Sequence, residues 1–238
     1  MDRGLSGAIL AAGKGERLRG AANGVPKPLV RIGGETLLEH QARLLAIAGA
    51  EPINAIVNSE TARLIQEARL NLPSGVGIIV RDTPNSMESL LVLSERIPSG
   101  RFLLTTVDAV LGVAELQRFV KVALGHYPPS AVSPDGVLGV VAWRGDKHPL
   151  FAEVAANGEL TRLGGSEGKL VTAGVYVFST RIFEFAAEAR SLGLNALRHY
   201  LGFLIEKGMK LAAVELSEVV DVDEGDDLLA AQALVCRD

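Results

Sequence analysis

The sequence contains very little cysteine and no long apolar run. Cys236 is the one cysteine among 238 residues, which excludes an intrachain disulfide and a cysteine-based zinc cluster. The four histidines never fall at the close spacings that metal-binding helices use. No apolar run reaches the ~20 residues that a membrane-spanning helix needs, and no secretory signal is visible. We therefore expect a cytoplasmic protein that has no membrane partner.

An excess of basic charge is also absent. The 24 Lys and Arg residues stand against 28 Asp and Glu, and the formal net charge of −4 argues against nucleic acid as the main partner. The charge is unevenly spread, because residues 1–50 contain seven Lys or Arg and four acids, whereas residues 215–238 contain eight acids and one Arg. We expect the first segment to hold phosphates and the last to hold a cation.

Strand-like and helix-like segments alternate through the first 130 residues. Short apolar runs alternate there with amphipathic segments of helical period, such as the one that Gly49 ends. This order predicts an α/β fold with a doubly wound, mostly parallel sheet covered by helices on both faces. Residues 130–165 have short strand-like runs joined by Gly, Pro and Asn turns, which indicates a small β-rich insertion.

The first strand-like run leads into a glycine-bearing loop within GAILAAGKGERLRGAANGVPKPLV. Its small residues let backbone N–H groups approach an oxyanion, and Lys14, Arg17 and Lys27 add positive charge around a triphosphate. The dinucleotide fingerprint needs a third glycine where this chain has Arg17, and the Walker loop needs a Gly-Lys-Ser/Thr sequence that is absent. The loop therefore predicts phosphate binding by a motif that is neither the dinucleotide fingerprint nor the Walker loop.

The segments AILAAGKGERLRG and PKPLV resemble the N-terminal signature of the sugar-1-phosphate nucleotidyltransferase (NDP-sugar pyrophosphorylase) superfamily. The resemblance implies a Rossmann-like, GT-A-like fold with the nucleotide above the carboxyl ends of the first strands. It implies that Arg17 and Lys27 are catalytic, since Arg17 would contact the phosphates and Lys27 would stabilise attack on the α-phosphate. The candidate nucleotide-binding residues of the loop are Leu10, Ala11, Ala12, Gly13, Lys14 and Gly15.

An enzyme of this superfamily needs Mg²⁺, and acids distant in sequence must converge to bind it. Mg²⁺ prefers oxygen ligands and keeps several waters, so one or two carboxylates plus the substrate phosphates suffice. Asp108 ends the apolar run FLLTTVD, where open α/β sheets bind ligands. The segment VVDVDEGDDLLAA resembles the ending that carries the second metal-binding acid, and both Asp221 and Asp223 are candidates.

The segment DTPNSMESL lies where the superfamily has a polar loop that reaches the nucleobase. Asn85, Ser86 and Ser89 are therefore candidate base or ribose contacts, and capping of the following helix is the alternative role. The Gly-Thr-Ala pattern that is usual in this loop is missing, so the nucleobase preference stays open.

The segment KLVTAGVYVFS resembles the part of the superfamily in which a glycine lies against the acceptor substrate. This suggests Gly174 as a position of close approach and Lys169 as a partner for the acceptor phosphate, with Arg162 competing for the same role. Sugar enzymes usually carry a Glu-Lys-Pro motif about ten residues earlier, where this chain has LTRLGG.

The resemblance implies a Mg²⁺-dependent nucleotidyltransferase that condenses an NTP with a phosphorylated small molecule and releases pyrophosphate. We expect one domain over 1–238, with a nucleotide-binding half at 1–130 and an acceptor-binding half at 131–238. A sugar 1-phosphate is the first expectation for the acceptor. The alternative is a cytidylyltransferase acting on an alcohol phosphate, such as phosphocholine or inositol phosphate, because the Glu-Lys-Pro motif is missing and the chain is short.

Three other interpretations compete with these. Molybdenum-cofactor nucleotidyltransferases share the loop, but PKPLV is closer to the sugar-type signature. A non-catalytic nucleotide or sugar-nucleotide sensor would have no need of Asp108 together with the acids at 221 and 223. A nicotinamide-dependent oxidoreductase would need a third glycine at position 17 or 18, where the chain has Arg17 and Leu18.

Overall fold

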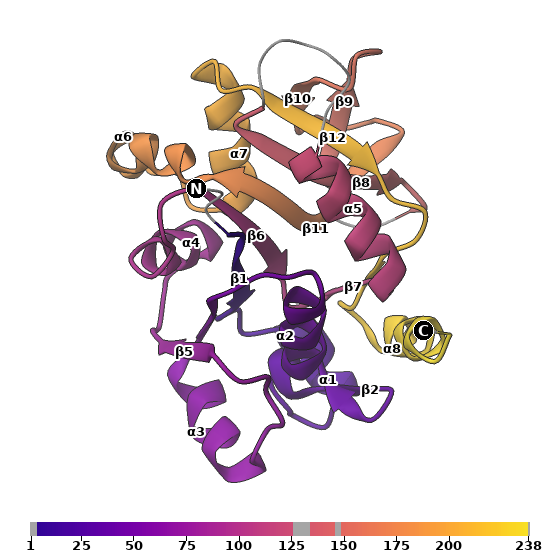
Figure 1. Cartoon of the computed structure of the whole chain (residues 1–238). Coiled ribbons are helices and arrows are strands. Elements are labelled where there is room, and N and C mark those ends of the chain that lie inside the picture. The colour runs from indigo at the N-terminus through magenta and orange to yellow at the C-terminus, as the bar shows by residue number, and fades with distance from the viewer. Residues whose placement is uncertain (1–3, 126–133, 146–148, 238) are drawn as a thin grey trace.

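A mixed sheet forms the centre of the computed structural model, which describes residues 4–125, 134–145 and 149–237 (Figure 1). Of the predicted β-rich insertion, residues 130–133 and 146–148 lie outside the described residues. Within the described ranges the sheet has nine strands: β1 (Ser6–Ala11), β4 (Ile53–Val57), β5 (Val76–Val80), β6 (Arg101–Thr106), β8 (Gly136–Ala142), β9 (Phe151–Val154), β10 (Leu160–Leu163), β11 (Leu170–Ser179) and β12 (Leu211–Glu215).

The order of the strands confirms the predicted doubly wound α/β fold. Strands β5, β4, β1 and β6 are neighbours and run parallel, so their carboxyl ends meet at one edge. Strand β11 pairs antiparallel with β6 and β8, and β12 pairs parallel with β8. The β9–β10 hairpin is attached to the first residues of β11, where the β-rich insertion was predicted.

Short strands and helices complete the fold. The short strands are β2 (Arg31–Ile32), β3 (Glu35–Thr36), β7 (Ala109–Val110) and β13 (Val220–Asp221). The helices are α1 (Glu16–Ala21), α2 (Leu37–Ile47), α3 (Ser59–Ala68), α4 (Ser86–Ser94), α5 (Val113–Gly125), α6 (Ala186–Ser191), α7 (Leu197–Glu206) and α8 (Gly225–Val235), with 3₁₀ turns η1 (Lys27–Leu29) and η2 (Thr180–Phe185). Among the described residues, no helix is both long and apolar enough to cross a membrane.

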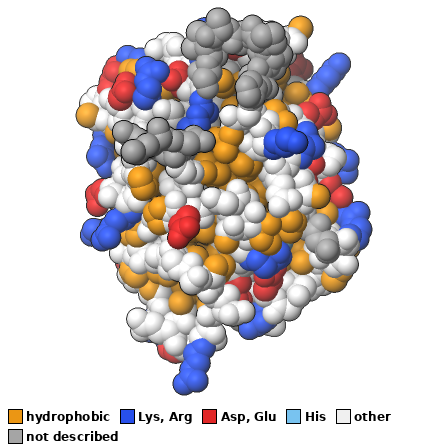
Figure 2. Space-filling view, in the orientation of Figure 1, with side chains coloured by type: hydrophobic (Ala, Val, Ile, Leu, Met, Phe, Trp, Pro, Cys, Tyr) orange, Lys and Arg blue, Asp and Glu red, His pale blue; other side chains and the backbone are white. Residues whose placement is uncertain are grey.

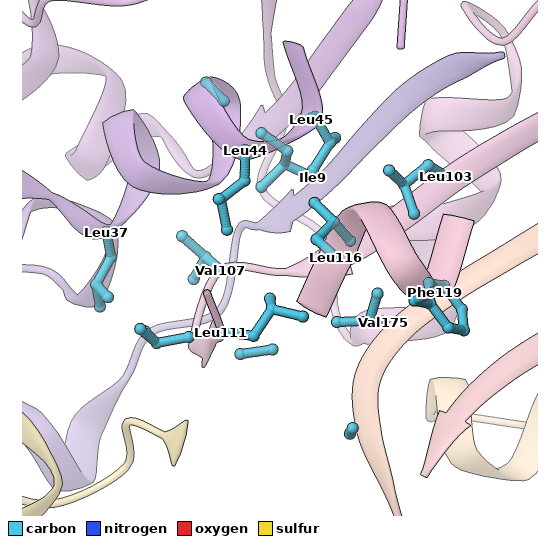
Figure 3. Packing of buried hydrophobic residues seen from close by; sticks show 14 of the residues in the cluster. Ile9, Leu37, Leu44, Leu45, Leu103, Val107, Leu111, Leu116, Phe119 and Val175 are labelled. Atoms are coloured by element: carbon cyan, nitrogen blue, oxygen red, sulfur yellow. The ribbon is translucent and has the colours of Figure 1, made fainter. Parts of the chain in front are cut away.

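Alternating side chains of β1 enter two hydrophobic cores. Ile9 is fully buried in the core that contains residues of α2 and α5, and Figure 3 shows it close to Leu45 of α2. Leu10 points to the opposite face, into the core that contains residues of α4 and α7. Because successive strand residues point to opposite faces, helices must cover both sides of the sheet.

The last helix returns to the first part of the chain. Figure 1 shows α8, in yellow, beside β2, in indigo, and a side chain on Gly33 would collide with Val235. The segment that precedes α8 therefore lies next to the N-terminal loop. On the face drawn in Figure 2, basic and acidic side chains are interspersed around hydrophobic and uncharged ones.

Candidate active site

Three acids from two segments that are distant in sequence meet beyond the end of β6. Strand β13 pairs antiparallel with β7, which sets Asp221 opposite Ala109, and the Val222 N–H donates to the Asp108 carbonyl at 3.0 Å. One carboxylate oxygen from each of Asp108, Asp221 and Asp223 lies within 4.8 Å of the other two. The short ladder between β7 and β13 is thus the local reason for the convergence that the sequence predicted.

Lys27 and Arg17 contact this acidic cluster directly. The Lys27 ammonium lies 2.9 Å from Asp108 Oδ2 and 2.6 Å from Asp223 Oδ1, and its side chain is 9% exposed. The Arg17 guanidinium reaches Asp223 Oδ2 at 2.9 Å and is half exposed. Two cations and two of the acids therefore form one connected network that joins residues about 200 positions apart.

The conformation of the glycine loop is fitted to Lys27. Gly15 has φ 58°, in the left-handed region, and a Cβ there would lie 2.7 Å from the Lys27 Cβ. Any other residue at this position would combine a strained backbone with a collision. Lys27 itself begins η1 between Pro26 and Pro28, whose rings restrict the backbone on both sides. The loop and the Pro-Lys-Pro turn are therefore packed as one unit.

Electrostatics keep Lys27 protonated. Burial lowers the pKa of Lys27, but the charge of Asp108 and hydrogen bonds to Asp223 and Asp108 oppose burial and outweigh it, so the pKa lies above its ordinary value. The side chain is therefore a permanent positive charge at neutral pH.

A cavity of about 630 Å³ lies above the carboxyl ends of β1 and β6. We call it the first cavity. Most of the predicted nucleotide-binding residues line it, but Ala11 does not, because its side chain is fully buried in the hydrophobic core. Its lining is Leu10, Ala12–Leu18, Lys27, Thr83–Ser86, Ser89, Thr106–Asp108 and Asp223.

The predicted base-contacting residues line the first cavity and also make structural hydrogen bonds. Asn85 caps α4, since its Oδ1 accepts from the Glu88 N–H at 2.9 Å. The Ser89 hydroxyl lies 2.6 Å from that of Thr83. The Ser86 hydroxyl accepts from the Leu197 N–H at 2.8 Å. Capping and substrate contact, the two roles weighed from the sequence, are therefore compatible for Asn85.

A second cavity of about 340 Å³ adjoins the first. Five residues line both cavities: Arg17, Ser86, Thr106, Asp108 and Asp223. The second cavity is also lined by Asp221 and by residues of β11 and α7, among them Thr172, Gly174, Tyr176 and Arg198. The acidic cluster thus stands at the boundary between two spaces, an arrangement suited to bringing two ligands together.

Gly174 lines the second cavity at an irregular point of β11. Its φ of 71° coincides with the shift in pairing register between Thr172 and Tyr176, and a Cβ would lie 2.5 Å from Thr106 Oγ1. Glycine is therefore required here for contact with the neighbouring strand. Burial raises the pKa of Tyr176 to about 12, so its hydroxyl stays protonated and can donate.

The two predicted phosphate partners of the acceptor lie elsewhere. Arg162 pairs with Glu153 at 2.9 Å on the exposed side of the β9–β10 hairpin, and Lys169 is an exposed residue; neither lines either cavity. Instead, Arg198 lines the second cavity, and among the described residues it has no ion-pair partner. The dipole of a helix disfavours a cation in its first turn. The position of Arg198 near the start of α7 was therefore a signal in the sequence that this side chain has a role other than stabilising the helix.

The acidic cluster fits a divalent cation. Three carboxylates offer hard oxygen ligands on one side, and the first cavity leaves space on the other for substrate phosphates and water. The Lys27 ammonium lies between two of these acids and balances part of their negative charge.

Two adjoining cavities that share two acids and Arg17 at the carboxyl edge of a doubly wound sheet suit a nucleotidyltransferase. Residues 7–175 match the family described as the MobA-like NTP transferase domain, and the chain belongs to this family. Membership of an enzyme family leaves the sensor and the oxidoreductase interpretations without support.

Two curated relatives are each named Bifunctional IPC transferase and DIPP synthase. The protein from Archaeoglobus fulgidus is 30% identical over 78% of this chain, and that from Rubrobacter xylanophilus is 27% identical over 98%. The chain spans 35% and 52% of their respective lengths.

Solved structures share the fold. The inositol-1-phosphate CTP transferase from T. maritima has a TM-score of 0.76 at 17% identity and matches 98% of this chain and 97% of its own. A protein described as a glucose-1-phosphate thymidylyltransferase, from Bacillus anthracis, has a TM-score of 0.79 at 16% identity and matches 97% and 94%. The CTP:phosphocholine cytidylyltransferase from Streptococcus pneumoniae has a TM-score of 0.73 at 20% identity and matches 97% and 99%.

Proposed function

We propose that this nucleotidyltransferase is a cytidylyltransferase that joins CMP from CTP to a polyol phosphate of the inositol phosphate type. The observation that carries the proposal is the second cavity, which adjoins the acidic cluster and offers Arg198 to an acceptor phosphate. The curated relatives, whose shared name includes IPC transferase, favour this acceptor over a sugar 1-phosphate, which was the first expectation from the sequence.

The lining of the second cavity suits a polyol better than choline. A quaternary ammonium group is usually held by several aromatic faces. Among the described lining residues, Tyr176 is the one aromatic side chain. Thr172, Thr106 and Asp221 instead offer hydroxyl and carboxylate groups, which can hydrogen-bond to the hydroxyls of a polyol.

Asn85 can contact the cytosine base of CTP in the first cavity. Its amide oxygen is engaged by the Glu88 N–H, so its NH₂ group is the part left to face a ligand. Cytosine presents two acceptors, O2 and N3, on its Watson–Crick edge, and an amide NH₂ can donate to either.

In the proposed reaction, an oxygen of the acceptor phosphate forms a bond to the α-phosphorus of CTP. The bond between the α-phosphorus and the oxygen that bridges it to the β-phosphate breaks, and pyrophosphate leaves. Lys14, Arg17 and Lys27 line the first cavity and would neutralise the triphosphate and the charge that develops during attack. Arg198 would orient the attacking phosphate. No side-chain nucleophile is required.

We propose Mg²⁺ as the cation that Asp108, Asp221 and Asp223 would hold. Mg²⁺ needs few protein ligands and keeps several waters. Three carboxylates beside an open cavity meet both needs. When bound, the ion would supply charge neutralisation to the triphosphate. The protein's own part is to hold the three carboxylates together through the β7–β13 ladder.

The test is a pyrophosphate-release screen of CTP, UTP, dTTP, ATP and GTP against inositol 1-phosphate, glucose 1-phosphate and phosphocholine, with Mg²⁺ and with EDTA. We expect the highest kcat/KM for CTP with inositol 1-phosphate, and no turnover with EDTA. Highest turnover with glucose 1-phosphate would restore the sugar assignment. Highest turnover with phosphocholine would contradict the argument from the cavity lining.

A further inference from the structure

The Ser86 hydroxyl is available to a partner outside its own helix. Ser86 is the first residue of α4, but Asn85 caps that helix by accepting from the Glu88 N–H at 2.9 Å. The Ser86 hydroxyl instead reaches 111 residues along the chain and accepts from the Leu197 N–H at 2.8 Å. Ser86 also lines both cavities, so this bond lies at the wall between them.

The start of α7 needs such a partner. The first N–H groups of any helix have no acceptor within the helix and must find one elsewhere. Ala196 occupies the N-cap position of α7 and has no side chain that could accept. The hydroxyl of Ser86 thus replaces the missing cap for the N–H of Leu197. The next residue along the helix is Arg198, which lines the second cavity.

The remaining contacts between α4 and the helices beside it do not depend on this hydroxyl. Glu88 of α4 pairs with Arg190 of α6 at 2.7 Å. Met87 and Leu90 of α4 are buried in the same hydrophobic core as Leu201 of α7. The fold therefore does not require the Ser86 hydroxyl, whose bond fixes only the first turn of α7.

We infer that Ser86 is a positioning residue for the acceptor: it holds the first turn of α7 and thereby sets Arg198 against the second cavity. The inference rests on the proposed function insofar as Arg198 binds the acceptor phosphate. It assigns Ser86 to the acceptor side of the reaction, whereas the sequence alone suggested a contact with the nucleotide.

The kinetic test compares Ser86→Ala, Ser86→Thr and the wild type with CTP and inositol 1-phosphate. We expect Ser86→Ala to raise KM for inositol 1-phosphate about fivefold, the size of one lost neutral hydrogen bond. KM for CTP and kcat should stay within about twofold. Ser86→Thr keeps a hydroxyl and should restore the acceptor KM. The matched control is Ser94→Ala, which removes a hydroxyl of α4 that bonds the Leu91 carbonyl at 2.6 Å, away from both cavities.

Combining variants shows whether Ser86 acts through Arg198. If it does, Ser86→Ala combined with Arg198→Gln should have the same acceptor KM as Arg198→Gln alone. Additive effects on the acceptor KM would overturn the inference. So would a rise in KM for CTP alone, because that result identifies Ser86 as a direct nucleotide contact.

Hydrogen exchange tests the inference independently of turnover. In the full chain without substrates, Ser86→Ala should speed exchange of the Leu197 amide about fivefold, while Ser94→Ala should not. Faster exchange without turnover on any polyol phosphate would uphold the link between Ser86 and α7 and contradict the proposed function. Unchanged exchange would overturn the inference and leave the proposed function standing.

Discussion

The two cavities of this protein are built in different ways. The first is formed mainly by three short stretches that follow parallel strands, Ala12–Leu18, Thr83–Ser86 and Thr106–Asp108, together with Lys27, which a Pro-Lys-Pro turn presents. The second is assembled from β8, β11, α7 and β13, which are scattered along the chain. A phosphate-binding loop can thus be encoded by a local sequence motif, whereas an acceptor site depends on how distant elements pack.

The acidic cluster belongs to both cavities, so its loss is predicted to have the largest effect. Asp108→Asn should lower kcat for pyrophosphate release about 1,000-fold, because it removes a proposed metal ligand and a partner of Lys27. Steady-state kinetics over a range of Mg²⁺ concentrations measures the loss. Asp226→Asn, an exposed acid at the start of α8, is the matched control and should remain fully active. Wild-type kcat in Asp108→Asn would remove Asp108 from the proposed metal site.

Substitutions of the two lysines of the first cavity should differ sharply in their effect on catalysis. Lys27 is buried between two acids, whereas Lys14 is exposed. We expect Lys27→Gln to lower kcat about 100-fold, since a fixed charge near the reacting phosphate is lost. Lys14→Gln should raise KM for CTP only about threefold, because solvent screens an exposed charge. Equal effects of the two substitutions on kcat would argue against a special role for Lys27.

In the second cavity, the structure and the sequence favour different phosphate partners. Arg198→Gln should raise KM for the acceptor about tenfold with little change in KM for CTP, as expected for loss of one charge-assisted contact. The predictions from sequence instead assign the larger effect to Lys169→Gln or Arg162→Gln. Measuring the acceptor KM of all three variants decides between them, and a larger effect of Lys169→Gln would contradict the role proposed for Arg198.

Much of the fold could be read from the sequence because its signals are local. Apolar runs of strand length and amphipathic runs of helical period predicted the alternation of strands and helices that the structure has in the first 130 residues. The meeting of Asp108 with the acidic segment around Asp223 was predicted from the resemblance to the superfamily. Asp108 lies just beyond β6, at the shared carboxyl edge of the parallel strands, whereas Asp221 and Asp223 are brought to it by the antiparallel β7–β13 pair.

The second cavity could not be predicted in the same way. Arg162 and Lys169 were assigned from the resemblance of their segments to the acceptor-binding part of the superfamily, but Arg162 lies on the outer side of the β9–β10 hairpin, where it pairs with Glu153. Arg198 reaches the cavity because α7 packs against α4, a contact between segments more than 100 residues apart. Hydrophobic periodicity predicts α7 as a helix but gives no information about what its first turn faces.

The smallest predicted effect concerns the segment that leads to Asp221. Glu115 in the first turn of α5 accepts from the Ser217 N–H at 2.5 Å and pairs with Arg118 at 2.9 Å. The hydrogen bond from Arg118, opposed by burial and aided by Ser217, lowers the pKa of Glu115 from 4.5 to about 2. Glu115→Gln should therefore lower the free energy of unfolding at pH 7 by about 1–2 kcal/mol, less than the shift alone implies because Arg118 is exposed.

The sign of the pH dependence makes this prediction specific. Because the pKa of Glu115 is lower in the folded state, its contribution is present above pH 4.5 and is lost as the pH falls toward 2. Urea titrations at pH 7, 4.5 and 3 should show the wild type and Glu115→Gln converging, while Glu67→Gln, which breaks an exposed pair, changes stability by less than about 0.5 kcal/mol. A difference between Glu115→Gln and wild type that does not change with pH would contradict the assignment. Activity at neutral pH should be unchanged, since the β7–β13 ladder still holds Asp221 opposite Ala109.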